Sequence, residues 1–331
     1  MRKFLFFFIL MCSIYRLYPQ IGGAGTFEFL NLNTSPRIIA LGGYITSVID
    51  EDINNGIYNP ALINSSMNHK LSLNYTNYYT DILYGDVGYC FNVWDYNFVS
   101  SIKFIDYGQF IETNEFGHQI GTFSAGEYLL SIGSSKSVDS LFYFGANTKL
   151  VYSSLYELSS LGVLVDFACT YAHPEKNITA SFIIKNLGYQ IVPYYNNNRE
   201  SLPFEILIGV ANKLAHMPLR WHLTFQHIET PDLSFDNSNN LSANDNLGFN
   251  ILRHVVLGAE FLIHKNASIL LGYNNRRRFE MIIEDRKALV GFSCGVSFKI
   301  KRFHFNYSRT SNHFSGPVNT FGIITNLIKV D

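Results

Sequence analysis

The chain has 331 residues and a formal net charge of −1, and this balance gives no indication of a nucleic-acid partner. Aromatic residues make up 15% of the chain and charged residues only 15%, against about 25% charged residues in typical soluble domains. No run of about 18 apolar residues follows the N-terminal segment, which excludes a bundle of transmembrane helices. Cys90, Cys169 and Cys294 are widely spaced and odd in number, and they indicate neither a disulfide framework nor a zinc site.

Residues 1–20 have the organisation of a secretory signal peptide. Arg2 and Lys3 precede an apolar run over residues 4–14, and a more polar stretch ends near Gln20. The apolar run is too short to cross a bilayer as a helix. Cys12 lies inside this run without a small residue before it, so lipid attachment is the weaker interpretation. We therefore expect a signal peptide over residues 1–20.

Residues 21–67 are the one sizeable part after the signal peptide that lacks a strand pattern, and we expect them to form an N-terminal plug segment. They contain the glycine pair Gly42 and Gly43 and the acidic run Asp-Glu-Asp at residues 50–52. This run lacks the regular spacing and the glycine of a Ca²⁺ loop, which favours a solvated acidic turn over a metal site.

The triplet Asn59, Pro60 and Ala61 has the features of a helix start. An Asn side chain accepts a hydrogen bond from the free N–H groups of the first turn, and Pro suits the first helical position. The sequence therefore predicts a short helix from Pro60 to about Asn64.

Apolar and polar residues alternate with a period of two from about residue 68 to the end. Leu71, Leu73 and Tyr75, for example, alternate with Ser72 and Asn74. One face of each segment is apolar and aromatic and the other is polar and small, as in strands with two different faces. Each segment is about as long as a tilted strand that crosses a membrane. We predict about fourteen strands, at residues 68–79, 83–93, 96–108, 125–136, 140–153, 160–173, 177–189, 202–213, 219–228, 254–264, 267–277, 287–299, 302–310 and 319–327.

The predicted connections are sorted by length. Those after even-numbered strands are short, at residues 94–95, 137–139, 174–176, 214–218, 265–266 and 300–301. Those after odd-numbered strands are mostly longer and include residues 109–124, 190–201, 229–253, 278–286 and 311–318. Short turns on one side and long loops on the other are typical of outer-membrane β-barrels.

We therefore predict an all-β fold, a transmembrane antiparallel β-barrel of about 14 strands over residues 68–331, with an N-terminal plug that contains a short helix. We expect the barrel to lie in the cell outer membrane, with its long loops extracellular and both termini periplasmic. Glu205, Glu260, Lys149 and Lys185 fall on the lumenal side of their strands, where charge is tolerated. A soluble β-sandwich that shields its apolar face inside remains the alternative.

Several blocks of sequence resemble one family. Residues 27–31 (FEFLN), 35–43 (SPRIIALGG) and 59–62 (NPAL) resemble the PorV/PorQ group of FadL-like outer-membrane proteins of the Bacteroidetes. Further blocks are similar to the PorQ members of that group, at residues 73–78 (LNYTNY), 121–128 (GTFSAGEY), 184–188 (IKNLG) and 202–206 (LPFEI).

This resemblance implies a part in the type IX secretion system. Its members are associated with a cell-surface attachment complex, in which a sortase-like protease removes C-terminal signals from secreted cargo and joins the cargo to lipopolysaccharide. The chain would be a non-catalytic membrane anchor that works with a PorZ-like surface protein, the protease and a PorV-like barrel. The alternative is a FadL-like transporter for hydrophobic small molecules. The lumenal faces are mostly Ser, Thr, Asn and Gly, which gives a transporter little support.

The sequence predicts no catalytic, cofactor-binding or metal-binding residue. It contains no HExxH motif, nucleophile elbow or glycine-rich phosphate loop, and its histidines are better interpreted as lumenal or turn residues than as metal ligands. Arg276, Arg277 and Arg278 follow the eleventh predicted strand and are candidates for contact with the phosphates of lipopolysaccharide or with a partner. An ordinary cationic loop is the equal alternative. Outer loops 229–253 and 276–286 are the expected docking regions.

Overall fold

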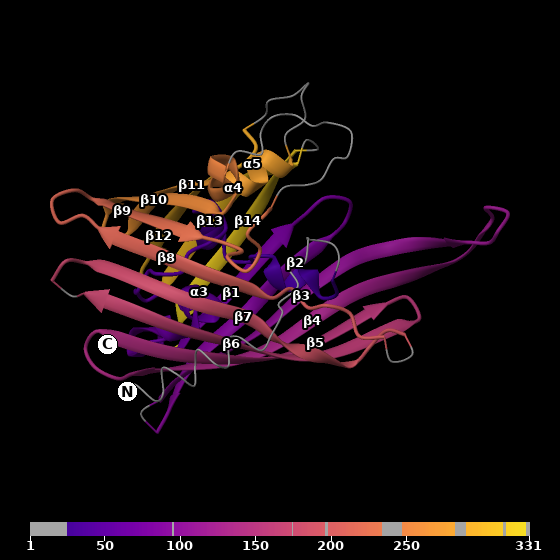
Figure 1. Ribbon diagram of the computed structural model, residues 1–331, viewed down its shortest axis with the longest axis horizontal. Helices are drawn as coiled ribbons and strands as arrows, with labels where there is room; N and C mark the ends of the chain where they lie inside the picture. The colour runs from indigo at the N-terminus through magenta and orange to yellow at the C-terminus, as the bar shows by residue number, and fades with distance from the viewer. Residues whose placement is uncertain are drawn as a thin grey trace.

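Fourteen antiparallel strands close into a single barrel in the computed structural model (Figure 1). The structure describes residues 25–94, 96–173, 175–195, 198–233, 247–281, 289–313 and 316–328. Each strand pairs with its neighbours in the chain, and β1 closes the barrel by pairing with β14, from Lys70 opposite Asn326 to Asn77 opposite Asn319. The predicted all-β barrel is confirmed. The predicted signal peptide lies outside the described residues.

Most strands begin and end within a few residues of the predicted positions. They are β1 (Lys70–Asn77), β2 (Leu83–Val93), β3 (Tyr96–Thr113), β4 (Gln119–Ser137), β5 (Phe142–Leu155), β6 (Leu158–His173), β7 (Ile178–Val192), β8 (Glu205–Lys213), β9 (Leu219–Phe225), β10 (Val255–His264), β11 (Ala267–Asn274), β12 (Phe292–Ile300), β13 (Phe303–His313) and β14 (Gly316–Asn326).

Two predicted loops are wrong in form. The predicted loop 109–124 is mostly strand, because β3 and β4 continue as a hairpin in which Phe110 pairs with Phe123. The predicted loop 311–318 is also mostly strand. Neither loop has a clear alternation of apolar and polar residues, and extended pairing satisfies its backbone groups. The connection between β5 and β6 is short, at residues 156 and 157, although it follows an odd-numbered strand.

Short helices replace part of two predicted outer loops. Helix α4 (Leu247–Arg253) precedes β10, and helix α5 (Asn275–Glu280) follows β11, where the sequence predicts strand to residue 277. Phe249 of α4 and Phe279 of α5 make an edge-to-face contact, with ring centroids 6.1 Å apart. Residues 234–246 and 282–288 of the predicted loops are not among those the structure describes.

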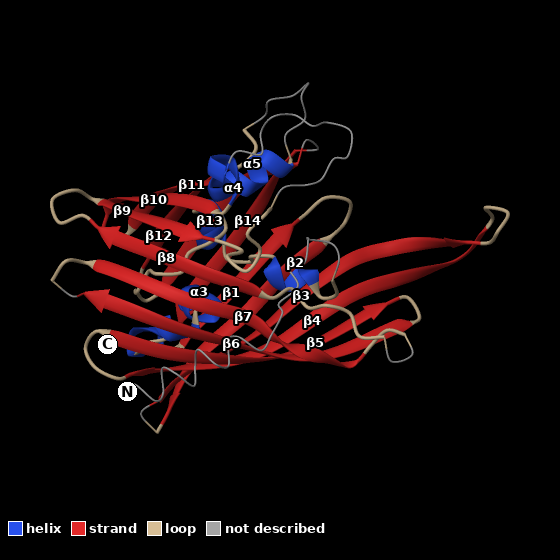
Figure 2. Ribbon diagram, in the orientation of Figure 1, coloured by secondary structure: helices blue, strands red, loops and turns tan. Residues whose placement is uncertain are grey.

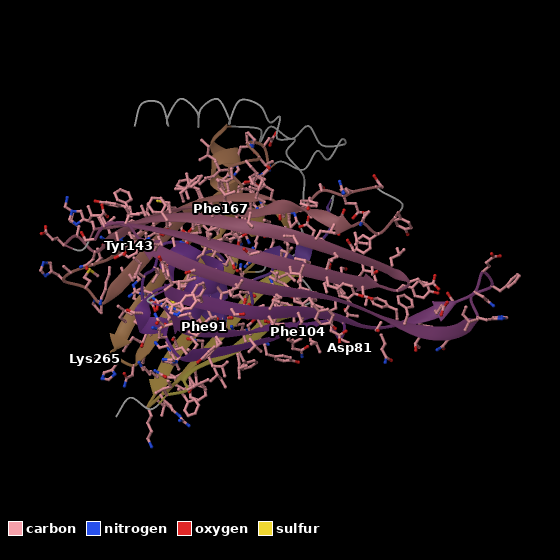
Figure 3. All side chains as sticks on the ribbon, turned by 90° about the horizontal axis from the view of Figure 1, so that it is seen from below. Asp81, Phe91, Phe104, Tyr143, Phe167 and Lys265 are labelled. Atoms are coloured by element: carbon pink, nitrogen blue, oxygen red, sulfur yellow. The ribbon has the colours of Figure 1, made fainter. Side chains whose placement is uncertain are left out.

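The barrel wall has its apolar side chains on the outside and its polar ones inside. On β1, Leu73 is 44% exposed and Ser72 is 0% exposed. The same alternation recurs around the wall. On β6, Phe167 is exposed on the outside (Figure 3), whereas Thr170 is buried. A soluble domain has the reverse arrangement, so the exterior is suited to contact with lipid.

The described residues before β1, from residue 25 onward, lie inside the barrel (Figure 2). We call residues 25–69 the lumenal segment. Its helix α2 contacts β11 to β14, helix α3 contacts β1 to β3, and the 3₁₀ helix η2 contacts β4 to β6. These strands lie all around the closed wall, so the segment spans the lumen. The helices are η1 (Glu28–Asn31), α2 (Pro36–Ala40), α3 (Ile53–Tyr58), η2 (Pro60–Leu62) and η3 (Ser65–Met67).

The predicted helix at Pro60 to Asn64 is shorter than expected, because η2 covers only Pro60–Leu62. Helix α3, just before it, was not predicted. Its sequence INNGIY contains residues of low helix propensity, and packing inside the barrel decides its conformation. No helix within the described ranges is long and apolar enough to cross a membrane.

Candidate functional site: the packed lumen

The glycine pair lets helix α2 end against the barrel wall. Gly42 and Gly43 have φ angles of +95° and +91°, a region that side chains rarely adopt. The Gly43 N–H donates to the Ile38 carbonyl at 2.9 Å, which completes a C-terminal capping turn. A Cβ atom on Gly42 would lie 2.5 Å from Cγ1 of Val256 on β10. Both the backbone angle and the space therefore require glycine here.

The Asn59, Pro60 and Ala61 triplet fixes a second close approach to the wall. The Asn59 side chain accepts from the Ala61 N–H at 2.9 Å and donates to the Thr46 carbonyl at 2.6 Å. A Cβ atom on Gly145 of β5 would lie 2.2 Å from the Pro60 carbonyl carbon. The predicted cap at Asn59 is present, and it positions η2 in backbone contact with β5.

A buried cluster of charges joins the lumenal segment to β9 and β10. The Arg37 guanidinium of α2 lies 2.7 Å from an Asp50 carboxylate oxygen, 3.2 Å from Asp52 and 3.1 Å from Glu260 of β10. Arg220 of β9 lies 3.2 Å from Asp50 and 3.0 Å from Glu260. Arg37 is only 4% exposed, and a buried guanidinium is tolerated only when it is paired in this way. We call these five residues the charge clamp.

The clamp changes the interpretation of the acidic run at residues 50–52. It is not a solvated turn, since Asp52 is 2% exposed and its carboxylate caps α3 by accepting from the Asn54 N–H at 3.0 Å. Glu51 makes ion pairs of 2.7 Å with Lys70 at the start of β1 and with Lys299 near the end of β12. The acidic run is therefore an attachment point between the lumenal segment and the wall.

The protonation states of the run follow from these partners. Burial alone would raise the pKa of Asp50, but the Arg37 and Arg220 guanidiniums lower it to about 2. Burial also opposes ionisation of Glu51, whereas hydrogen bonds from Lys299 and Lys70 lower its pKa to about 2. For Arg37, burial favours the neutral form, yet the carboxylates of Asp50, Glu260 and Asp52 raise its pKa well above the ordinary value. All three groups are charged at neutral pH.

A second polar group lies on the opposite part of the lumen. Lys149 of β5 lies 2.6 Å from the Asp166 carboxylate of β6 and donates to Asn186 Oδ1 at 2.8 Å. Asn186 donates in turn to the Pro203 carbonyl at 2.8 Å. The Lys185 ammonium lies 4.1 Å from the centre of the Tyr58 ring at the end of α3. Two of the sequence blocks, 184–188 and 202–206, are thus in contact with each other and with the lumenal segment.

The predicted lumenal charges are confirmed. Glu205, Glu260, Lys149 and Lys185 are all buried inside the wall. A cavity of about 60 Å³ remains between the wall and the lumenal segment, and Lys103, Lys149, Lys185, Asp86 and Asp166 are among its lining residues. An engineered apolar cavity of about 150 Å³ binds benzene, so this space is both smaller and more polar than a hydrocarbon site.

The arginine triplet is not displayed as three free cations. Arg276 is paired with Glu280, Nε to Oε1 at 2.5 Å. The Arg277 guanidinium abuts Gly43, because a Cβ atom there would lie 2.5 Å from its Nη2. The side-chain amide of Asn274, at the end of β11, also contacts the segment and donates to the Gly42 carbonyl at 3.2 Å. The structure thus turns Arg277 toward the lumenal segment, whereas contact with lipopolysaccharide stays a prediction.

The histidines lie in the lumen or at strand ends. His222 is buried inside the wall, His227 contacts Glu229 at 2.9 Å, and His254 contacts the Gln226 carbonyl at 2.8 Å. Within the described part of the chain, no three His, Cys, Asp or Glu side chains are grouped so that they could hold a metal ion.

Several solved structures have a fold similar to that of this chain. The chain aligns with the Ralstonia pickettii toluene transporter TbuX at a TM-score of 0.53 and 14% identity, over 90% of this chain and 99% of that one. It aligns with a TodX monoaromatic hydrocarbon channel at 0.52 and 13%, over 89% and 97%. The CymD channel gives 0.50 and 10%, over 95% and 100%. The chain is therefore similar in fold to these three proteins. No protein-family model and no curated protein matches it.

The charge clamp was missed by sequence reasoning. Glu260 was assigned to the lumenal side, but Arg220 was not, and neither was linked to Arg37. The signal was present, because Arg220 and Glu260 occupy inward positions on adjacent strands and are directly opposite in register. What the sequence could not supply was the position of Arg37 across the lumen.

Proposed function

We propose that this chain is a non-catalytic anchor in the outer membrane that holds the surface attachment complex of a type IX secretion system. The observation that carries the proposal is the packed lumen. The lumenal segment is tied to β9 and β10 by the ion pairs Asp50–Arg220 and Arg37–Glu260, and it makes close contacts with other strands at Gly145 and Gly272. A barrel whose lumen is filled in this way is suited to act as a fixed support in the membrane and to expose its outer rim to a partner.

The sequence blocks that resemble the PorV/PorQ group support the same proposal. The block at residues 35–43 forms α2 and its glycine turn, and the block at residues 59–62 forms the contact with β5. These residues therefore build the lumenal packing. The proposed partners are a PorZ-like surface protein, the sortase-like protease and a PorV-like barrel, together with lipid and lipopolysaccharide around the wall.

A second candidate is a transporter for hydrophobic small molecules. The similarity of fold to proteins described as a toluene transporter and monoaromatic hydrocarbon channels favours it. The charged residues that line the 60 Å³ cavity beside the lumenal segment, Lys103, Lys149 and Lys185 among them, weigh against it. A transporter of this kind needs an apolar path or a segment that moves aside.

One deletion strain separates the two candidates. Cells without this chain are tested for the amount of secreted cargo attached at the surface and for the rate of toluene uptake. The anchor predicts loss of attached cargo, unchanged uptake, and recovery of surface proteins with the chain from gently solubilised outer membrane. Normal cargo attachment with slower toluene uptake would instead establish the transporter and remove the anchor.

A further inference from the structure

The β3–β4 hairpin extends far beyond its neighbours. Strand β2 pairs with β3 only as far as Asp106, and β5 pairs with β4 only as far as Ala125. Past those residues β3 and β4 pair only with each other, from Gln109 opposite Ser124 to the turn at Asn114. Figures 1 and 3 show this hairpin projecting away from the barrel. We call residues 109–124 the arm.

Both edges of the arm are unpaired. A free strand edge presents N–H and C=O groups that can add another strand, and proteins usually blunt such edges with lysine, proline or a cover. Residues 109–124 contain no lysine, arginine or proline. Their pairing is regular from Gln109 opposite Ser124 to Glu112 opposite Gly121, between irregularities at Asp106/Gln109 and at Glu112/Thr113. The edges are therefore open to strand addition.

The arm exposes large apolar side chains to solvent. Ile111 is 65% exposed, Ile120 is 61% exposed, and Phe116 in the turn is 83% exposed. These residues lie past the rim opposite the one where β1 begins and β14 ends, beyond the strands that would face lipid. Exposed apolar residues of this kind mark a contact surface.

The arm is held in a fixed direction by the barrel. Phe110 stacks on Phe123 with ring centroids 5.2 Å apart, and Phe123 makes an edge contact of 4.7 Å with Tyr156 in the β5–β6 turn. The Tyr156 hydroxyl donates to Glu112 Oε1 at 2.7 Å. An isolated hairpin is barely stable in water, so this support presents the arm as a preformed template.

We propose that the arm binds a cell-surface protein by strand addition, taking up an extended strand that carries basic side chains beside apolar ones. Glu112 and Glu115 are the carboxylates of the arm, and no lysine or arginine of the arm offsets them. Pairing with a second copy would bring these carboxylates together, whereas a basic strand complements them. The inference deepens the proposed anchor, because it names the surface on which a partner docks.

The test follows hydrogen exchange of the arm in native outer-membrane vesicles and in the purified protein. Outward amides of the arm have no partner in the purified chain, and an added strand in the native membrane slows their exchange at least about tenfold. The variant Ile111→Lys blunts the edge and abolishes that difference. The matched control Val138→Lys changes an exposed apolar residue in the β4–β5 turn and preserves it.

A second variant replaces residues 110–123 by Asn-Gly, so that Gln109 and Ser124 close a two-residue hairpin turn. It inserts into the outer membrane as the parent does and loses the surface partner in co-purification. A photoreactive Ile111→benzoylphenylalanine variant cross-links to a different protein. Equal exchange in vesicles and in purified protein, or a cross-link to a second copy of this chain, would overturn the inference.

The experiments distinguish refutation of strand addition by the arm from refutation of the proposed anchor. If deletion of the whole chain abolishes cargo attachment but the shortened arm leaves it intact and exchange is unchanged, the anchor stands and the arm is refuted. If deletion leaves cargo attachment intact, the anchor is refuted, and the exchange measurement still decides whether the arm adds a strand.

Discussion

Replacement of Arg37 by methionine is expected to release the lumenal segment from β9 and β10. The charge clamp contains two guanidiniums, Arg37 and Arg220, and three carboxylates, Asp50, Asp52 and Glu260. Without Arg37, the single Arg220 faces three carboxylates. Removal of one partner from a buried ion pair costs about 3–5 kcal/mol, which corresponds to a roughly 100- to 3,000-fold shift toward the released state. Methionine retains much of the side-chain length, so the loss is mainly electrostatic.

The shift is measured by hydrogen exchange of the backbone amides in α2 and α3. In the parent chain these amides are protected by helical hydrogen bonds inside the barrel, and in Arg37→Met they exchange faster by about the same factor. Arg302→Met, which removes an exposed cation in the β12–β13 turn, is the matched control. The double variant Arg37→Met with Glu260→Gln restores part of the protection, because it also removes one of the unpaired carboxylates.

The reasoning would be refuted by unchanged exchange in Arg37→Met. It would also be refuted if the double variant were as unstable as the sum of the two single variants, since the two sites would then act independently.

Three further predictions concern pH, packing and the lipid face. Folding lowers the pKa of Asp50 from 3.8 to about 2. The contribution of Asp50 to the free energy of unfolding is therefore complete above pH 4 and is lost as the pH falls toward about 2. Hydrogen exchange of α2, corrected for the intrinsic rate, should show constant protection from pH 8 to 5. Gly145→Ala places a Cβ atom 2.2 Å from the Pro60 backbone of the lumenal segment and should lower the free energy of unfolding, measured by chemical denaturation, by about 1–3 kcal/mol or more. Gly248 has open space around it, so Gly248→Ala should leave the free energy of unfolding unchanged. Leu73→Arg puts a charge on the lipid face and should reduce the free energy of folding into vesicles by about 2–4 kcal/mol. Trp94→Arg, at the rim, should reduce it by only about 0–1 kcal/mol. Equal reductions would show that the wall does not face lipid.

The barrel was predictable because its signal is repeated around the wall. Alternation with a period of two predicts which side chains of a strand face outward and which face the lumen. Short turns between successive strands predict that these strands pair. The same signal was missing at the arm, where Phe110 and Ile111 are adjacent apolar residues and the sequence predicted a loop. Nothing in the sequence states where a strand leaves the membrane, since the pairing of Phe110 with Phe123 obeys the same rule as pairing inside the wall.

The lumenal packing was less predictable because it depends on contacts between residues far apart in the chain. The sequence indicated the cap at Asn59 and the lumenal side of Glu260, which are local properties. It could not indicate that Arg37 reaches Glu260 across 223 positions, or that Gly145 leaves room for Pro60. Helix α3 is a similar case, because residues with weak helical preference fold into a helix only where the barrel encloses them.

The difference between a closed anchor and a hydrocarbon channel depends on what the lumenal side chains bind. A hydrophobic ligand needs an apolar surface that it can desolvate, whereas here Lys103, Lys149 and Lys185 line one cavity beside the lumenal segment. Passage of such a ligand would bring apolar groups against buried charges, which is unfavourable unless the charges remain hydrated. These lumenal charges therefore oppose passage of an apolar ligand, and under the proposed anchor a partner would dock on the arm.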